Sequence, residues 1–259
     1  MDAVPFFDRV GDSYEPRDPC RGPWDRETLH GRVIAGVMAH ELETRYGDPS
    51  FQVSRLTVDM FRIAPYAPVR VTTELVRDGN RIKVVDATLW SGETAIARSS
   101  ALLLRRADAP DGEVWKRPGW IAPHPESLPK RESRNEGWEP AWETRAIDFD
   151  PASPTPKRTW LRESRPFIEG VPLTPFVRCV LVSDFTNPVA NSGTQGLNYV
   201  NADVTLYLHR DLVGEWIGAE VIHHESAEGV ATGVCVLHDL SGAIGTATVC
   251  AVANRRKGN

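Results

Sequence analysis

The stretch TLHGRVIAGVMAHELE, residues 28–43, decides the fold of this chain. Small residues are interspersed with larger apolar ones along it, and Gly47 follows where a helix typically receives its C-terminal cap. The stretch therefore predicts a helix that is apolar on almost every side and must be wrapped by other elements. It opens with His30 and Gly31, although a plain polar cap would suffice there.

A second stretch, TPFVRCVLVSDFTN at residues 174–187, predicts another apolar helix. Thr174 is a typical N-cap, Pro175 suits the first helical position, and Pro188 predicts the end of the helix. One sheet that curls around such a helix is the simplest way to bury it.

The chain contains an internal repeat. Residues 56–89 align with residues 202–235 at a constant offset of 146, and a two-residue insertion then aligns 95–96 with 243–244. Each copy holds four short runs rich in Val, Ile, Thr and Leu, separated by turn-forming residues. Four such runs in a meander predict an antiparallel sheet in each half, preceded by one helix.

Alternation along residues 202–208 assigns the side chains of this strand to two faces. Three apolar residues share one face and three others share the opposite face: Val204, Leu206 and Leu208 against Asp203, Thr205 and Tyr207. The repeat also aligns His223 and His224 with the turn at residues 78–79, so we expect these two histidines at a solvated hairpin tip.

The repeat predicts an N-terminal unit at residues 1–106, a connector at 107–140 and a C-terminal unit at 141–259. The connector region is rich in proline and charge, as linkers are. Five of the eight tryptophans nevertheless fall between residues 115 and 160, and a disordered tether would not carry so many large aromatics. We therefore expect the connector to pack on both units, and residues 142–149 to form the opening strand of the second.

Charge and composition argue against several functions. The 259 residues carry a net charge of -5 without a long basic run, which disfavours a nucleic-acid partner. The sequence has no apolar run of about 18 residues for a membrane span, and Asp2 and Asp8 are atypical of a signal peptide. The four cysteines form no Cys-x-x-Cys pair, and no two histidines have metal-ligand spacing. We expect a cytoplasmic protein with neither a metal nor a redox cofactor.

Five short motifs occur in a characteristic order: GPW (22–24), HG (30–31), NADVTLYLHR (201–210), GEW (214–216) and VLHD (236–239). They resemble the motifs of thioesterase-like double hot-dog proteins related to type-II acyl-CoA thioesterases. The resemblance implies an α+β fold of two fused hot-dog repeats, in which antiparallel sheets wrap a central helix. It also implies hydrolysis of a small-molecule acyl thioester, with CoA as part of the substrate.

The resemblance further implies a catalytic site in the second repeat. Asp203 matches the catalytic aspartate of the type-II thioesterases, which holds the attacking water, and Ser226 lies near the position of the assisting hydroxyl. Thr57 occupies the place of Asp203 in the first repeat, so we expect one functional groove rather than two. Val249 occupies the position of the family's glutamine and cannot orient water.

The start of the first helix supplies the other part of this expected site. Backbone N–H groups near Gly31 and Arg32, at the positive end of the helix dipole, would bind the oxyanion. His30 and Thr205 join Gly31 and Arg32 as expected substrate-binding residues. The interpretation requires the Asp203 side chain to lie close to residues 30–32.

Two other functions remain open at this stage. Val249 favours a catalytically silent acyl-CoA or acyl-carrier binding protein that has kept the groove. Asp25 and His30 have the D-x-x-x-x-H spacing of a hot-dog enoyl-CoA hydratase, although such a spacing also arises by chance. Sheet edges of this kind commonly pair, which is compatible with a homo-oligomer.

Overall fold

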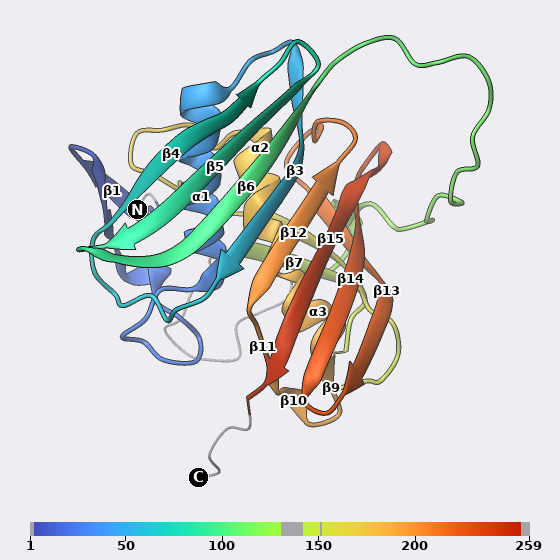
Figure 1. The fold of residues 1–259 in the computed structure, drawn as a ribbon. Helices are drawn as coiled ribbons and strands as arrows, with labels where there is room; N and C mark the ends of the chain where they lie inside the picture. The colour runs from blue at the N-terminus through green and yellow to red at the C-terminus, as the bar shows by residue number, and fades with distance from the viewer. Residues whose placement is uncertain (1–2, 131–141, 151, 255–259) are drawn as a thin grey trace.

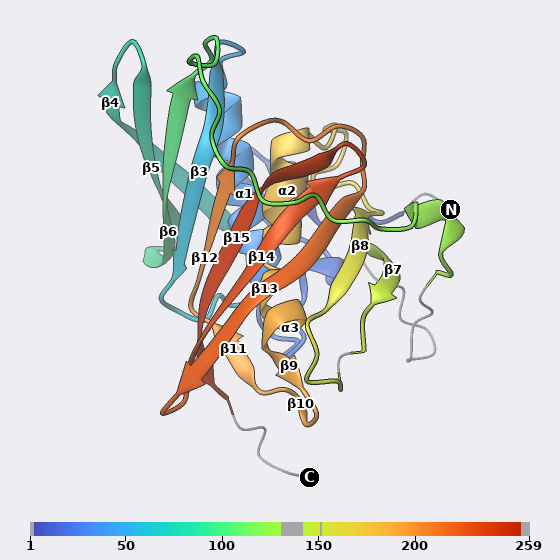
Figure 2. The same ribbon diagram turned by 90° about the vertical axis from the view of Figure 1, so that its right-hand side faces the viewer.

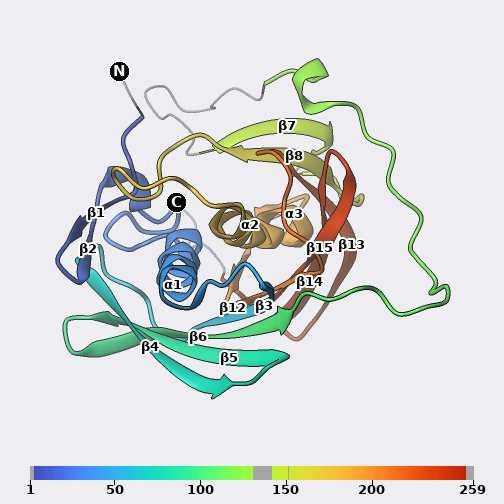
Figure 3. The same cartoon turned by 90° about the horizontal axis from the view of Figure 1, so that it is seen from above.

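One large antiparallel sheet curls around the helices and forms the body of the molecule (Figure 1). The computed structural model describes residues 3–130, 142–150 and 152–254. The view from above shows the strands as a shell around α1, α2 and α3 (Figure 3). The sheet has 13 strands, in the order β1-β2-β4-β5-β6-β3-β12-β15-β14-β13-β8-β7, and β11 pairs with β15 beside this path. This is the α+β double hot-dog architecture that the sequence predicts.

Each half of the chain has helical residues followed by four strands, but not the four-strand meander that the sequence predicts: the last three strands form a meander and the first strand pairs with the last, in the orders β4-β5-β6-β3 and β13-β14-β15-β12. The first half contains α1 Gly31–Tyr46, β3 Phe51–Met60, β4 Val69–Asp78, β5 Ile82–Ser91 and β6 Thr94–Arg105. The second half contains α2 Pro175–Ser183, α3 Thr186–Asn191, β12 Asp203–Leu208, β13 Ile217–Ala227, β14 Val230–Asp239 and β15 Gly242–Ala253. The remaining elements are β1 Phe7–Val10, β2 Ser13–Pro16, η1 Asp18–Cys20, η2 Pro125–Ser127, β7 Trp142–Asp148, β8 Arg158–Glu163, β9 Ser192–Gly193, β10 Gly196–Leu197 and β11 Tyr199–Asn201.

The two halves of the sheet meet at the pair β3–β12, and the strand order on one side of this pair mirrors the order on the other. The sequence repeat is visible in the element bounds, because β15 begins and ends 148 residues after β6 (242 against 94, and 253 against 105). Phe7 of β1 pairs with Ile168, which follows β8 in the sequence. The segment after β8 therefore contacts β1, at the opposite edge of the sheet from β8 and β7.

The helix α1 begins and ends where the sequence predicts. His30 is its N-cap and Gly47 its C-cap, and residues 32–42 are all buried. Gly47 has a φ of -59°, so a left-handed backbone is not the reason for glycine here. A Cβ at this position would instead collide with the Glu43 carbonyl oxygen, and glycine removes that collision.

The helices α1 and α2 lie side by side and run in opposite directions. The first residue of α1, Gly31, faces Asp184 at the end of α2, whereas Glu43 near the end of α1 accepts a 2.5 Å hydrogen bond from Thr174, the N-cap of α2. Gly36 lies between these two contacts, against Leu181. This antiparallel packing brings the start of each helix to the end of the other.

The second helix differs from the expected single helix over 174–187. Thr174 and Pro175 open α2 as predicted, but the helix ends at Ser183, and α3 then runs to Asn191. Pro188 does not end a helix, as the sequence predicts it would, but is the third residue of α3. Proline is tolerated there, because the N–H groups in the first turn of a helix have no partner within that helix.

The hairpin tip also differs from the expected one. His223 and His224 lie within β13, and the turn that joins β13 to β14 is formed by Glu228 and Gly229, with φ values of 50° and 81°. The strands of the two hairpins are related by 148 residues rather than 146, since β4 and β13 begin at 69 and 217 and β5 and β14 at 82 and 230, so the sequence alignment placed the tip too early in the second half.

The connector packs on the outer side of the second half over its last described residues (Figure 2). The Trp120 ring stacks on His238 with centroids 4.2 Å apart, and Arg117 forms an ion pair with Glu220. Residues 131–141, which include Trp138, lie outside the described residues. The strand β7 begins at Trp142, where the sequence predicts the opening strand of the second unit. The unit boundaries themselves stay a prediction.

In the described part of the chain, no helix is long and apolar enough to cross a membrane.

Candidate active site at the start of α1

The first turn of α1 presents a backbone donor without a partner. The His30 ring nitrogen Nδ1 accepts a 3.2 Å hydrogen bond from the Arg32 N–H, and the His30 carbonyl accepts from Val33 and Ile34. Within residues 3–130, 142–150 and 152–254, the Gly31 N–H has no acceptor. A free N–H at the positive end of a helix is suited to bind a developing negative charge.

A buried carboxylate faces this helix start. Asp184 caps the end of α2, and only 6% of its side chain is exposed. Its Oδ2 lies 3.5 Å from His30 Nδ1, and a Cβ built on Gly31 would lie 3.1 Å from its Oδ1. Asn201 of β11 donates a 2.8 Å hydrogen bond to the same Oδ1. Neither Asp184 nor Asn201 was among the residues that the sequence predicts for the site.

Apolar groups surround this cluster. The Trp142 ring meets His30 edge-on at 6.1 Å and Phe185 at 5.2 Å between centroids. The Met60 sulfur would lie 3.1 Å from a Cβ on Gly31, so an alanine there would crowd both this sulfur and the Asp184 carboxylate. Glycine therefore leaves the start of α1 accessible at close range. His30 keeps 22% of its side chain exposed and lies at the edge of the site.

Arg32 is bound within the protein. Its guanidinium forms a buried ion pair with Glu163 and lies over the Trp142 ring at 4.1 Å and the Phe6 ring at 5.2 Å. Burial lowers the pKa of Arg32 to about 9, and the Asp184 carboxylate opposes this shift. The side chain that was expected to meet substrate thus fills space beside the helix start.

The structure places Asp203 and Thr205 on the outer face of the sheet. Their strand neighbours Val204 and Leu206 are buried towards the helices, whereas Thr205 bonds Thr57 on the opposite face at 3.1 Å. Asp203 lies opposite Asp59 in β3, and its Oδ1 accepts a 2.6 Å hydrogen bond from the Cys250 N–H. Burial raises the pKa of Asp203, and the Cys250 N–H opposes this effect. The structure does not bring its carboxylate to residues 30–32.

Ser226 lies apart from Asp203, and Val249 offers no polar group. Ser226 is an exposed residue near the end of β13, and the strands β14 and β15 separate it from β12. Three strand spacings of about 4.8 Å place it roughly 14 Å from the Asp203 strand. Val249 is fully buried in β15 and contributes no polar group.

The spacing that suggested a hydratase has a local explanation. The Asp25 carboxylate accepts a 2.9 Å hydrogen bond from the Glu27 N–H in an exposed loop, and the Asp25 carbonyl accepts from Thr28. Asp25 therefore stabilises the turn that leads into α1, as short polar residues commonly do.

The start of α2 lacks the donor that α1 offers. Thr174 caps it as His30 caps α1, and Glu43 stands where Asp184 stands at the other end. The first helical residue, however, is Pro175, which has no N–H. At the first helical position itself, only α1 of these two helices carries a backbone N–H that could bind an oxyanion.

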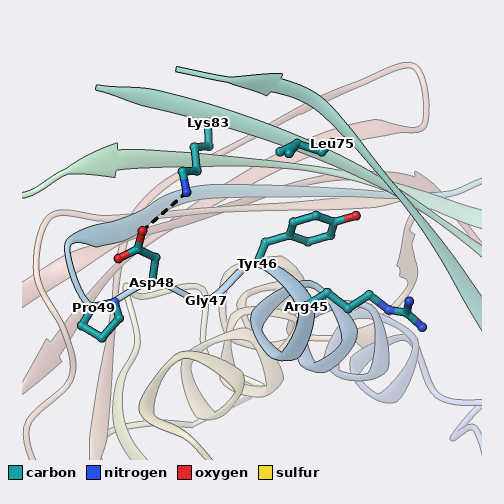
Figure 4. Close-up of a pocket in the computed structure, with 7 residues that line it drawn as sticks. All are labelled: Arg45, Tyr46, Gly47, Asp48, Pro49, Leu75 and Lys83. Carbon is teal, nitrogen blue, oxygen red and sulfur yellow. Dashed lines mark hydrogen bonds and ion pairs between the residues drawn. The ribbon is translucent and has the colours of Figure 1, made fainter. Parts of the chain in front are cut away.

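A cavity of about 310 Å³ lies at the opposite end of α1, between the helix end and strands β4 and β5 (Figure 4). Its lining includes Tyr46, Leu75 and the ion pair Lys83–Asp48, whose charged atoms are 3.4 Å apart. A helix of 16 residues at about 1.5 Å per residue separates this cavity from Gly31 by roughly 20 Å.

Among the described residues, no group of three or more His, Cys, Asp or Glu could hold a metal ion.

The environment of His30 fixes its charge. Burial lowers the pKa of His30 to about 4, the Asp184 carboxylate opposes this shift, and the Arg32 cation adds to it. His30 is therefore neutral at pH 7, which agrees with the hydrogen bond that its Nδ1 accepts from the Arg32 N–H.

This low pKa predicts a pH-dependent loss of stability. Below pH 6.5 the unfolded chain protonates His30 while the folded protein does not, so the free energy of unfolding falls as the pH drops from 6.5 towards 4. His30→Asn keeps an N-cap acceptor but does not titrate. Between pH 7 and pH 5 we expect the wild type to lose about 1 to 2 kcal/mol more than this variant in urea unfolding. Equal losses in the two proteins would contradict a neutral His30.

The shared sheet and the two antiparallel helices define a double hot-dog protein with one candidate site at a helix start. The family model of the acyl-CoA thioesterase N-terminal domain matches residues 20–104, and that of the C-terminal domain matches residues 108–249, more than half of the chain. The chain therefore belongs to the acyl-CoA thioesterase family, as its motifs predict.

Solved structures support the fold over the whole length. A hot-dog protein of unknown function from Alicyclobacillus acidocaldarius has a TM-score of 0.76 at 14% identity, covering 96% of this chain and 95% of that one. An acyl-CoA thioesterase II, TesB2, from Mycobacterium marinum has a TM-score of 0.67 at 17% identity and 96% coverage of both chains. The tesB protein of Mycobacterium avium subs. paratuberculosis scores 0.68 at 17% identity and 95% coverage of both. At these identities the likeness concerns the fold alone. No curated protein matches the sequence.

Proposed function

We propose that this protein hydrolyses acyl thioesters at the start of α1, with Asp184 as the carboxylate that activates water. The observation that carries the proposal is the meeting of the Asp184 carboxylate with the first turn of α1, where the Gly31 N–H has no acceptor among the described residues. A base and an oxyanion donor thus lie within reach of one carbonyl group. Membership of the acyl-CoA thioesterase family supports the same class of substrate.

The reaction is a substitution at the thioester carbonyl. Water attacks the carbon, its proton passes to the Asp184 carboxylate, and the negative charge on the carbonyl oxygen is stabilised by the Gly31 N–H and the dipole of α1. The carbon–sulfur bond then breaks, and the proton held by Asp184 returns to the leaving sulfur. The products are a carboxylic acid and a free thiol.

Asn201 supplies the side-chain amide that position 249 lacks in this reaction. Its Nδ2 already donates to Asp184 Oδ1, so the carboxylate keeps a fixed orientation with Oδ2 directed towards His30. In this proposal Asp203 does not contact the substrate and acts only through its hydrogen bonds with neighbouring groups. Its carboxylate holds the Cys250 N–H, and its carbonyl accepts from Asn201 at 3.3 Å. Asp203 is therefore a positioning residue.

A catalytically silent acyl-CoA binding protein is the second candidate. The packing of Arg32 against Trp142 beside the helix start favours it, because these side chains occupy space that a bound acyl group would need. The two functions predict different outcomes with the same substrates.

We expect a screen of acyl-CoAs of different chain length and branching to release free CoA thiol from at least one of them. Release should be at least about tenfold above that of buffer, since even a modest enzyme exceeds background by far more. Binding of a non-hydrolysable thioether analogue is measured alongside. Binding without thiol release across the panel would select the silent protein, and loss of enoyl absorbance without thiol release would select a hydratase.

A further inference from the structure

A chain of side-chain amides links the surface of β13 to the strand that carries Asn201. Asn187 donates a 3.1 Å hydrogen bond from Nδ2 to the Tyr199 carbonyl, and its Oδ1 accepts 2.9 Å from Asn191. Asn191 Oδ1 in turn lies 2.8 Å from His224 Nδ1. Asn187 and Asn191 are 3% and 5% exposed, so their mutual hydrogen bond is made away from solvent, whereas His224 at the end of the network is exposed.

The Tyr199 carbonyl fixes the direction of the whole chain. A carbonyl can only accept, so Asn187 must present its NH2 group to it and leave its oxygen for Asn191. Asn191 then presents its own NH2 group to Asn187, and its remaining oxygen requires a donor. His224 therefore carries a proton on Nδ1. Each of the two side-chain amides therefore has one orientation. The acceptor at one end, the Tyr199 carbonyl, and the donor at the other, His224 Nδ1, are both determined.

The amide chain is built on a rigid support. α3 packs so closely on β14 that a Cβ at Gly233 would lie 2.7 Å from the Ala190 side chain and 2.9 Å from Asn191 Oδ1. Asn187 belongs to the first turn of this helix, and its N–H donates to the Asp184 carbonyl. Asp184 and the amide chain thus share one backbone segment.

We infer that Asn187 is a positioning residue that holds β11 at the distance at which Asn201 meets Asp184, an inference that rests on the proposed function. β11 is short, from Tyr199 to Asn201, and lies beside the main path of the sheet. Its first residue is tied to α3 by Asn187, and its last residue binds the carboxylate that closes α2. Loss of the tie at Tyr199 lets Asn201 move away from Asp184, and small displacements of this kind lower turnover strongly.

The test replaces Asn187 by Asp, which keeps the acceptor for Asn191 but turns the contact with the Tyr199 carbonyl into a repulsion. We expect kcat for thioester hydrolysis to fall by about tenfold with little change in KM, because catalytic orientation rather than substrate binding is disturbed. Asn198→Asp is the matched control, since Asn198 makes its contact with Gln195 in an exposed turn just before β11. It should keep wild-type kcat.

A double-mutant cycle separates positioning from general damage. In the Asn201→Ala background, Asn187→Asp should cause no further loss of kcat, because the side chain that it positions is already absent. Multiplying losses would overturn the inference. A readout without substrate keeps the test independent of the proposed function. The Ala202 N–H, which donates to the Cys250 carbonyl at 2.9 Å, should exchange with solvent about tenfold faster in Asn187→Asp. Unchanged exchange would also overturn the inference, whatever the activity of the wild type.

Discussion

Asp184→Asn is expected to lower kcat/KM for thioester hydrolysis by about a thousandfold, or about 4 kcal/mol of barrier. Asparagine has nearly the shape of aspartate and can still contact Asn201 after its amide turns, but it cannot accept the proton of the attacking water. The rate of thiol release on the best substrate of the acyl-CoA panel measures the effect. The thermal unfolding midpoint of the variant shows that the fold is kept.

Asp203→Asn is the matched control for this prediction. It removes the same charge from a carboxylate that binds a backbone N–H on the outer face of the sheet. We expect it to lower the rate by less than about tenfold, through its effect on the position of Asn201. The reverse result, with a near-inactive Asp203→Asn and an active Asp184→Asn, would refute the assignment of Asp184 and return the role to Asp203.

Most of the fold could be predicted because its signals are local. Alternation with period two assigns the faces of a strand, and the repeat predicts the same order of elements in both halves of the chain. The bounds of β6 and β15 show how closely the two copies correspond. The break between α2 and α3 was missed because Ser183 and Asp184 lie within an otherwise apolar run that reads as continuous helix.

The candidate site was harder to predict because its parts are distant in sequence. Gly31 and Asp184 are 153 residues apart and meet only because α1 and α2 pack in opposite directions. No local pattern encodes that packing. One signal was present, since Asp184 is the one carboxylate in the second apolar helix stretch, and a buried charge in such a place commonly has a functional partner.

The alternation along its strand explains why Asp203 does not reach residues 30–32. The alternation assigned Asp203 to the face opposite Val204 and Leu206, and the resemblance required it to lie beside residues 30–32. In the structure Val204 and Leu206 are 1% exposed, and Asp203 lies across from Asp59, whose carboxylate binds the exposed Arg98. The face of a strand is set by the burial of its apolar residues, which no single motif can reverse.

Gly36→Val is expected to cause the largest loss of stability, because Gly36 lies where α1 packs directly against Leu181 of α2. A Cβ at this position would lie 2.6 Å from the Leu181 Cδ2 atom and 2.8 Å from the Phe167 Cζ atom. Glycine within a helix costs about 0.5 to 1 kcal/mol relative to alanine, so helix propensity alone would favour replacement. Valine must push the helices apart, and we expect a loss of about 3 kcal/mol in the free energy of unfolding.

Thermal and urea unfolding measure this effect, and for a chain of this size a loss of about 3 kcal/mol lowers Tm by roughly 6 to 12 °C. Gly119→Ala is the control, since a Cβ at Gly119 would meet no atom within 4 Å. It should leave stability almost unchanged. Leu181→Ala should restore part of the loss in Gly36→Val, because it removes one of the two obstructing side chains.

Since Gly36 lies five residues after Gly31 on the same helix, separation of the helices there also draws the start of α1 away from Asp184. A Gly36→Val protein with wild-type stability would show that α1 and α2 are not in close contact, and the meeting of Gly31 with Asp184 would lose its structural basis.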